Sequence, residues 1–387
     1  MTLGHPPPCG RTGNRIVSGS LARPACLLLA VLLAGCVTTP VTAPGIALDS
    51  SRLERSKYLE FVYAGKELPT IEYRQRLVHM NTSVPPLQCP LSSPVTGTRP
   101  VVAAWVWRSE ALLHDRNAAR AFLQRAAAHG ISALYLQIHP DLNSFAGFLE
   151  LARSHNIRVF ALGGSPGDVD DYGPDLRTVD RVLAYNRSHT AGFSGIQFDI
   201  EPYLLRRYRS NRQAVLRRYA GLLRALHARS AGRIPFEVVI PFWFDQEAVG
   251  GRNLEGIVFR NADSVAIMSY RTRIGQLRAI SNKGLCYGRM YGKPVMLGIE
   301  LGHIPTETHY FLAVSQLAPY IRMSDGHPYL AKDPRDFTHY ARQYRVPGSE
   351  ISFYPHVRAA FRYTRSPIPY RSFSGWIMDG LDRVWIR

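Results

Sequence analysis

The feature that most constrains this chain is a rhythm that begins at residue 101. Short apolar runs, rich in β-forming residues, alternate with longer amphipathic stretches, and the runs number eight. They are Val101–Trp107, Ala133–Ile138, Arg158–Leu162, Gly195–Asp199, Phe236–Pro241, Ser264–Met268, Val295–Ile299 and Ser374–Met378. Near-continuous apolar strands separated by helices predict a parallel sheet buried on both faces. Eight such units predict an α/β fold, a single (β/α)8 barrel of the TIM type over residues 101–387.

Two of the intervening stretches carry clear helix signals. Residues 117–130 end at Gly130, a common helix stop, and residues 211–232 place leucines on one stripe with arginines opposite. An open doubly wound sheet is the alternative, but the number of strands and the absence of a phosphate-binding glycine motif after the first strand favour the barrel. The interval between Ile299 and Ser374 is long, and we expect an extra loop or lid there.

Residues 1–36 have the pattern of a bacterial secretion signal. Arg11, Arg15 and Arg23 precede an apolar run at 25–34, which is too short to span a membrane. The run ends in "LAGC", and this stretch resembles the bacterial lipoprotein box. The resemblance implies cleavage before Cys36 and acylation of Cys36, for example by palmitate. An ordinary signal peptide with a chance cysteine is the alternative.

Residues 37–100 are expected to form a tether and an N-terminal extension. The first part, 37–47, is small, polar and proline-rich, and 82–100 is also proline-rich. Between them, Leu53, Tyr58 and Phe61 show some helical spacing. Val37 stands where an aspartate would indicate retention in the inner membrane, so we expect a lipid anchor in the outer membrane, facing the periplasm or the cell surface.

The chain is strongly basic, with 47 Lys and Arg against 29 Asp and Glu and a net charge of +18. This balance predicts attraction to anionic surfaces such as acidic polysaccharide or phospholipid head groups. We expect no nucleic-acid partner, no metal and no cofactor, because the sequence contains no motif for any of them. Cys89 and Cys286 either pair in an oxidising compartment or stay free.

A pair of carboxylates ends the fourth predicted strand, in the stretch "SGIQFDIEPY". If the intervening apolar residues face the helices, then Gln197, Asp199 and Glu201 face the barrel interior and approach the mouth at its carboxyl end. Two carboxylates held so close cannot both ionise freely, so one keeps its proton and can serve as a general acid. Pairing of both acids with arginines is the alternative interpretation.

This stretch resembles the fourth-strand signature of the chitinase-like glycosidases, glycoside hydrolase family eighteen. Three further motifs agree in order: "ALGG" at Ala161–Gly164, "MSYR" at Met268–Arg271, and Trp376 in the eighth strand. The resemblance covers roughly residues 101–387, and only these short motifs carry it. It implies a glycoside hydrolase that acts on a polysaccharide or an envelope glycan.

Carried over residue by residue, the resemblance implies a role for each motif residue. Glu201 matches the proton donor, Asp199 the carboxylate that orients the substrate's N-acetyl group, and Tyr270 a hydrogen-bonding partner of the same group. In that family the acetamide oxygen of the substrate attacks the anomeric carbon. Substrate contacts are expected from six strand-end residues: Gln197, Trp376 (by stacking on a sugar face), Arg271, Glu300, Gly163 and Gly164.

The chain also departs from the family pattern. Ser194 and Gln197 stand where the family has aspartates, Ala161 where it has serine, and Arg271 where it has aspartate. A cation at 271 suits an acidic sugar or a phosphate group better than chitin. These departures leave open a non-catalytic role, in which the barrel binds a glycan as a carrier or as an envelope-assembly factor.

Other polar residues follow predicted strands: Gln137, His139, Trp243, Asp245, Glu300 and Asp379. Glu300, at the end of the seventh strand, gives a further alternative, because a Glu201–Glu300 pair would match the other large class of barrel glycosidases. Their carboxyl groups would then lie roughly 5 Å apart for retention or about 6.5–9.5 Å apart for inversion. Glu300 could equally be a structural partner of Arg271 or Arg273.

Overall fold

The computed structural model describes residues 45–64, 69–74 and 100–386, and these contain the predicted closed barrel. The eight parallel strands pair in the ring order β11-β12-β17-β4-β5-β6-β7-β8. They are β4 (Val101–Val106), β5 (Ala133–Gln137), β6 (Arg158–Gly163), β7 (Gly195–Phe198), β8 (Phe236–Pro241), β11 (Ser264–Met268), β12 (Val295–Glu300) and β17 (Phe373–Asp379). Every predicted strand is therefore confirmed, and β17 pairs with β4 to close the ring.

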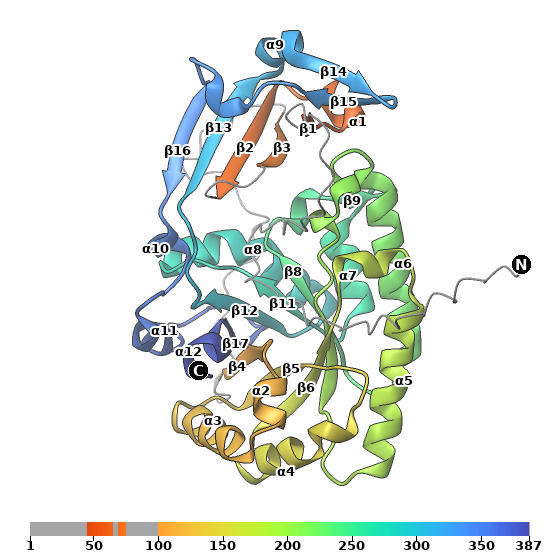
Figure 1. The fold of residues 1–387 in the computed structure, drawn as a ribbon, viewed down its shortest axis with the longest axis vertical. Helices are drawn as coiled ribbons and strands as arrows, with labels where there is room; N and C mark the ends of the chain where they lie inside the picture. Colours follow the sequence, from red (N-terminus) through yellow and green to blue (C-terminus); the bar gives the residue numbers. More distant parts are fainter. Residues whose placement is uncertain (1–44, 65–68, 75–99, 387) are drawn as a thin grey trace, which may run out of the picture.

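Helices surround the ring between successive strands (Figure 1). They are α2 (Glu110–Leu113), α3 (Arg116–Ala128), α4 (Ala146–Ser154), α5 (Gly173–Ser188), α6 (Arg212–Ser230), α7 (Leu254–Asn261), α8 (Ile274–Tyr291), α10 (Gly348–Ile351), α11 (Val357–Tyr363) and α12 (Leu381–Trp385). The helix predicted at 117–130 begins at Arg116 because the Asp115 side chain accepts from two backbone N–H groups of its first turn. It ends before Gly130, whose φ of 76° continues no helix. Within the described ranges, no helix is long and apolar enough to cross a bilayer.

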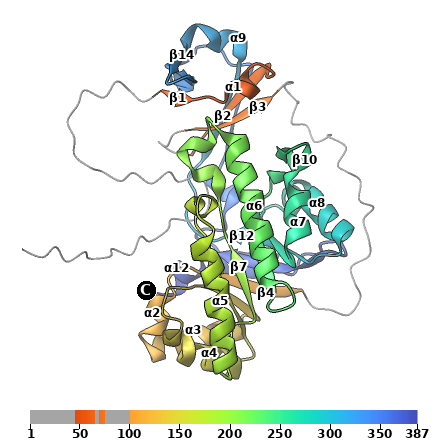
Figure 2. The ribbon, with the colours of Figure 1, turned by 90° about the vertical axis from the view of Figure 1, so that its right-hand side faces the viewer.

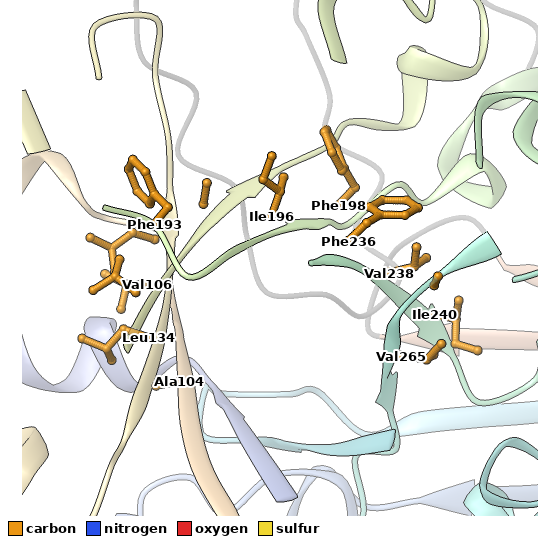
Figure 3. Close-up of a cluster of buried hydrophobic side chains, with 14 of the residues drawn as sticks. Ala104, Val106, Leu134, Phe193, Ile196, Phe198, Phe236, Val238, Ile240 and Val265 are labelled. Carbon is orange, nitrogen blue, oxygen red and sulfur yellow. The ribbon is translucent and has the colours of Figure 1, made fainter. Parts of the chain in front are cut away.

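Two apolar clusters lie on the two faces of the barrel strands. The outer cluster fills the layer between strands and helices, and Figure 3 shows part of it, with Phe198 of β7 beside Phe236 of β8. The inner cluster fills the ring and includes Trp105, Tyr135 and Met268. Since neighbouring residues of a strand alternate between these clusters, membership of one or the other tells which way a strand residue faces.

The interval between β12 and β17 is not an irregular loop. It contains β13 (Glu307–Ala313), α9 (Val314–Leu317), β14 (Ile321–Ser324), β15 (His327–Leu330) and β16 (Arg342–Val346). These elements combine with β1 (Ile46–Ala47), α1 (Ser50–Leu53), β2 (Tyr58–Ala64) and β3 (Thr70–Arg74) of the N-terminal extension. We call the result the small β unit. It has a four-stranded sheet in the order β16-β13-β2-β3 and a three-stranded sheet in the order β1-β15-β14.

The structure corrects the helical spacing expected around Tyr58 and Phe61, because both belong to strand β2. This strand is buried on both faces, so it lacks the period-two pattern that marks a half-buried strand. The residues of the predicted signal, including Cys36, and the proline-rich stretch with Cys89 lie outside the described residues. Cys286 in α8 is disulfide-bonded, and its partner lies outside the described residues.

The small β unit lies at one end of the barrel, as Figures 1 and 2 show from two directions. Among the described residues, two chain segments join it to the barrel, one leaving β12 and one leaving β16. A side-chain ion pair also joins the small β unit to the barrel. Glu247, which follows β8, pairs with Arg52 of α1 at 3.4 Å and with Arg212 of α6 at 2.6 Å. The N-terminal extension is therefore fastened to the barrel by side chains as well as by the sheet.

Candidate active site

The end of β7 is held against the end of β6 by a close backbone contact. The N–H of Asp199 donates to the carbonyl of Gly163 at 2.9 Å, which extends the ladder one residue beyond the strand. Gly164 has φ +105°, and a Cβ there would lie 2.6 Å from the carbonyl oxygen of Asp199. Only glycine fits at position 164, so Gly164 of the "ALGG" motif is required for this backbone contact with Asp199.

Glu201 lies at the mouth and is 8% exposed. It directly precedes a short 3-10 turn, Pro202–Leu204, and the hydroxyl of Tyr203 donates to its Oε1. The ring of Tyr203 packs edge-on against Trp243, which follows β8, with 5.0 Å between centroids. The carboxyl of Glu201 is therefore fixed by a donor that is itself held by the neighbouring loop. Sequence reasoning missed Tyr203 because its contact depends on that loop.

In the part of the chain that the structure describes, neither Arg271 nor Arg273 forms an ion pair with Glu201. Arg273 pairs instead with Glu350 of α10 at 3.2 Å. Arg271 donates to its neighbour's carbonyl, that of Tyr270, at 2.7 Å, and its guanidinium lies over the ring of Phe242. Burial lowers the pKa of Arg271, while the charges of Glu307 on the small β unit and Glu350 of α10 oppose this shift. The cation at 271 thus faces the small β unit, and its position does not support the expected preference for an acidic sugar.

Gln197 faces the barrel interior, as predicted, but its amide is occupied there. The indole N–H of Trp105 donates to its Oε1 at 2.6 Å, and its own Nε2 donates to Glu237 at 3.2 Å. Burial raises the pKa of Glu237, although hydrogen bonds from Tyr135, Ser264 and Gln197 oppose the shift. The substrate contact expected of Gln197 is therefore wrong: this side chain completes a buried polar network, and the sequence alone gave no sign of Glu237 as its partner.

Tyr270 and Trp107 converge on one carboxylate at the end of β17. The hydroxyl of Tyr270 donates to Asp379 Oδ2 at 3.3 Å, and the indole N–H of Trp107 donates to Asp379 Oδ1 at 3.0 Å. Asp379 itself is fully buried. The donor that the resemblance assigns to a substrate acetamide is thus directed at a protein carboxylate. Trp107, two positions after Trp105 on the first strand, is an interior residue that the sequence reasoning passed over.

Glu300 lies beside Asp379, because β12 and β17 are in register at these two residues. It is fully buried and accepts a hydrogen bond from the N–H of Gly302. Burial and the charge of Asp379 raise the pKa of Glu300 well above its ordinary value, against the opposing effects of Gly302 and Arg383. Because the Glu300 carboxyl has no exposed surface, the structure supports neither the expected substrate contact nor the nucleophile of the alternative mechanism at this residue.

The prediction for Trp376 is also wrong. Its side chain is fully buried in the outer cluster, where it packs edge-on against Tyr363 of α11 and Phe373. On β17 the inward positions are Ile377 and Asp379, one residue out of step with Trp376. A ring on the helix side of a strand cannot stack on a sugar inside the mouth. In the described ranges, no cluster of three or more potential ligands is placed to hold a metal ion.

Comparisons with known proteins give similarity in structure only. No protein-family model and no curated protein matches the sequence. A chitinase from Chromobacterium violaceum is 14% identical, with 72% of this chain and 93% of that chain covered and a TM-score of 0.41. The spore cortex-lytic enzyme SleL of Bacillus megaterium is 14% identical, with 74% and 71% covered and a TM-score of 0.41. An endo-beta-N-acetylglucosaminidase from Cordyceps militaris is 14% identical, with 75% and 84% covered and a TM-score of 0.40. The solved structures similar to this chain are thus chitinases and related glycosidases, at low identity.

Proposed function

We propose that this protein is a glycoside hydrolase of a polysaccharide or an envelope glycan, with Glu201 as general acid. The observation that carries the proposal is the placement of Asp199 and Glu201 directly after β7 of a closed barrel, with Glu201 at the mouth and held by Tyr203. Asp199 assists from the deeper position. Tyr270 assists from the end of β11, two strands along the ring from β7.

The proposed reaction begins with transfer of the Glu201 proton to the glycosidic oxygen as the bond from that oxygen to the anomeric carbon breaks. Positive charge then develops on the sugar ring, and the Asp199 carboxylate stabilises it. If the sugar carries an acetamide, its oxygen attacks the anomeric carbon, and Asp199 orients that group. Water, deprotonated by the Glu201 carboxylate, then completes hydrolysis and returns the proton to Glu201.

The test is Glu201→Gln, which keeps the shape of the side chain and its acceptor for Tyr203 but removes the acid. Release of reducing ends should fall by about 10²–10⁴-fold while glycan binding is retained. Glu110→Gln, an exposed change in α2, is the matched control and should leave turnover unaltered. Unaltered turnover in Glu201→Gln would remove the hypothesis.

A non-catalytic glycan-binding role is the second candidate. It is favoured by one observation, that the Tyr270 hydroxyl donates to Asp379 rather than pointing at a position beside Glu201. In that case the wild-type protein and Glu201→Gln should bind a glycan equally well, and neither should release reducing ends. The same pair of measurements therefore separates the two functions.

We also propose that Cys36 carries a lipid that anchors the protein in the outer membrane. The support is the sequence pattern before Cys36, since this segment lies outside the described residues. Cys36→Ser should release the protein from the detergent phase of a detergent–water partition. Equal partition of both forms would contradict the anchor.

A further inference from the structure

A pocket of about 440 Å³ lies where the chain passes between the barrel and the small β unit. One wall is the segment that leaves β12, and the other is the segment that returns from β16 through α10. Its lining consists of His303, Ile304, Pro305, Thr306, Pro347, Gly348, Ser349, Ser352 and Tyr354. This volume falls within the range of about 300–1,000 Å³ that is usual for sites that bind small ligands.

Tyr354 gives the pocket an aromatic surface. Its side chain is 50% exposed, which is unusual for a large ring in this structure. The backbone that carries this ring is held, because the N–H of Tyr354 donates to Ser352 Oγ at 3.0 Å. Ser352 is buried and its hydroxyl reaches the carbonyls of Gly302 and Glu300. An exposed ring on a rigid backbone is the arrangement that offers contact area to a ligand at little cost in conformational entropy.

Polar groups surround this ring without adding a fixed charge. The imidazole of His303 lies edge-on to the ring of Tyr354, with 5.5 Å between centroids and 88° between planes. Thr306 and Ser349 supply hydroxyls, and the lining contains no Lys, Arg, Asp or Glu. A flat ring bordered by hydroxyl and imidazole groups suits a sugar, whose C–H face is apolar and whose edge carries hydroxyls. The lack of charge favours an uncharged glycan over an acidic one.

The pocket adjoins the end of β12 along the chain. His303 follows Glu300 by three residues, so their Cα atoms are at most about 11 Å apart. Ile304 and Ile351 point from the same two segments into the inner cluster. We propose that this pocket is a second glycan-binding subsite, which holds a linear uncharged glycan chain by stacking a sugar on Tyr354 while another unit occupies the mouth.

The choice of ligand class rests on the proposed function, so the experiment measures binding apart from hydrolysis. In Glu201→Gln protein, affinity is compared for the dimer and the hexamer of N-acetylglucosamine. The hexamer should bind more tightly, since it can reach both places. Adding Tyr354→Ala should weaken hexamer binding by about tenfold and leave dimer binding unaltered, whereas Tyr354→Phe should retain both.

Tyr320→Ala is the matched control, because Tyr320 is also an exposed tyrosine, at 36%, but lies on the small β unit away from the pocket. Unchanged hexamer affinity in Tyr354→Ala, equal weakening of dimer and hexamer, or no hexamer binding at all would overturn the subsite. If the wild type binds the hexamer through Tyr354 but releases no reducing ends, the subsite stands and the hydrolase proposal fails.

Discussion

The barrel and the small β unit differ in how the chain builds them. From β4 to β12, each barrel strand pairs with the next barrel strand along the chain across a short helical connection, and only β17 returns after the long insertion to pair with β12 and β4. In the small β unit, β2 of the N-terminal extension pairs with β13, and the His309–Glu60 contact between them joins residues 249 positions apart. The first region is assembled from local units, and the second exists only if two distant segments meet.

The two regions also differ in what fills them. The barrel has apolar clusters on both faces of its strands. The four-stranded sheet has an apolar cluster on one face, around Leu59 and Phe61, and a buried polar network on the other. In that network His309 lies between Glu60, at 2.9 Å, and Glu307, at 3.4 Å. The pKa of His309 is shifted by these carboxylates, so the stability of the small β unit should depend on pH through this imidazole.

The largest expected effect breaks the barrel at its closing pair. In Gly375→Ala, the added methyl group would fall on the backbone of Val101, within 2.8 Å of its nitrogen, so β17 and β4 cannot pair as they do. We expect a loss of more than about 4 kcal/mol in the free energy of unfolding, measured by chemical denaturation. Gly147→Ala is the control, because open space surrounds that position in α4, and it should stabilise by up to about 1 kcal/mol.

The next effect should be confined to the small β unit. Phe61 is fully buried in its core, and Phe61→Ala should cost about 3–5 kcal/mol of local stability. Hydrogen exchange should then accelerate in β2 and β13 while β7 and β8 stay protected. Phe145→Ala, an equally buried change in the outer cluster of the barrel, should instead accelerate exchange in β7 and β8 as well as in β2 and β13. Equal exchange patterns in both variants would mean that the two regions unfold as one.

A smaller effect depends on pH. Burial alone would lower the pKa of His309, but the hydrogen bonds and charges of Glu307 and Glu60 outweigh it and raise the pKa. The ring also stacks on Tyr344 of β16, with Arg342 of β16 over that tyrosine and Arg271 of the barrel facing Glu307. Because the folded-state pKa is raised, the protonated imidazole contributes stability that is complete below about pH 6.5 and is lost as the pH rises through the folded-state pKa.

Protection against hydrogen exchange in β2 and β13, relative to an unfolded chain at the same pH, should therefore fall above that range. His309→Gln should abolish this dependence of protection on pH. His114→Gln, an exposed change next to α2, is the control and should leave the dependence intact. A dependence that survives in His309→Gln would assign it to another group and contradict the role given to this imidazole.

The smallest effect concerns the ion-pair contact between the two regions. Arg52 is partly exposed, and Glu247 keeps its closer partner Arg212 when Arg52 is removed. Arg52→Ala should therefore cost less than about 1 kcal/mol, measured as the midpoint shift of the small β unit's transition. A cost as large as that of Phe61→Ala would show that this contact, rather than the apolar core, holds the unit in place.

The contrast explains what could be predicted from the sequence. The eight strands were evident because apolar runs and helices alternate at short range, and the turn chemistry at Gly130 marked a helix end. The pairing of β2 with β13 left no local pattern, because β2 is buried on both faces and the buried positions of β13 include the polar residues Glu307 and His309.

The candidate active site shows the same division between features with a local sequence pattern and features that depend on distant partners. The position of Asp199 and Glu201 directly after the fourth barrel strand could be predicted from the sequence, whereas Trp376 was misplaced because a motif position does not fix which face of a strand a residue occupies. Tyr203, Trp107 and Glu237 acquire their roles from partners on other strands and loops. Such partners are set by the three-dimensional register of the ring, which the one-dimensional pattern does not encode.

The central claim is that Glu201 donates a proton to the leaving group, and the most direct measurement compares two leaving groups. Hydrolysis by wild type and Glu201→Gln is measured for a natural glycan and for an aryl glycoside whose activated leaving group needs little protonation. We predict that Glu201→Gln slows the natural glycan by about 10²–10⁴-fold and the aryl glycoside far less. Equal losses on both substrates, or no loss on the natural glycan, would contradict the account.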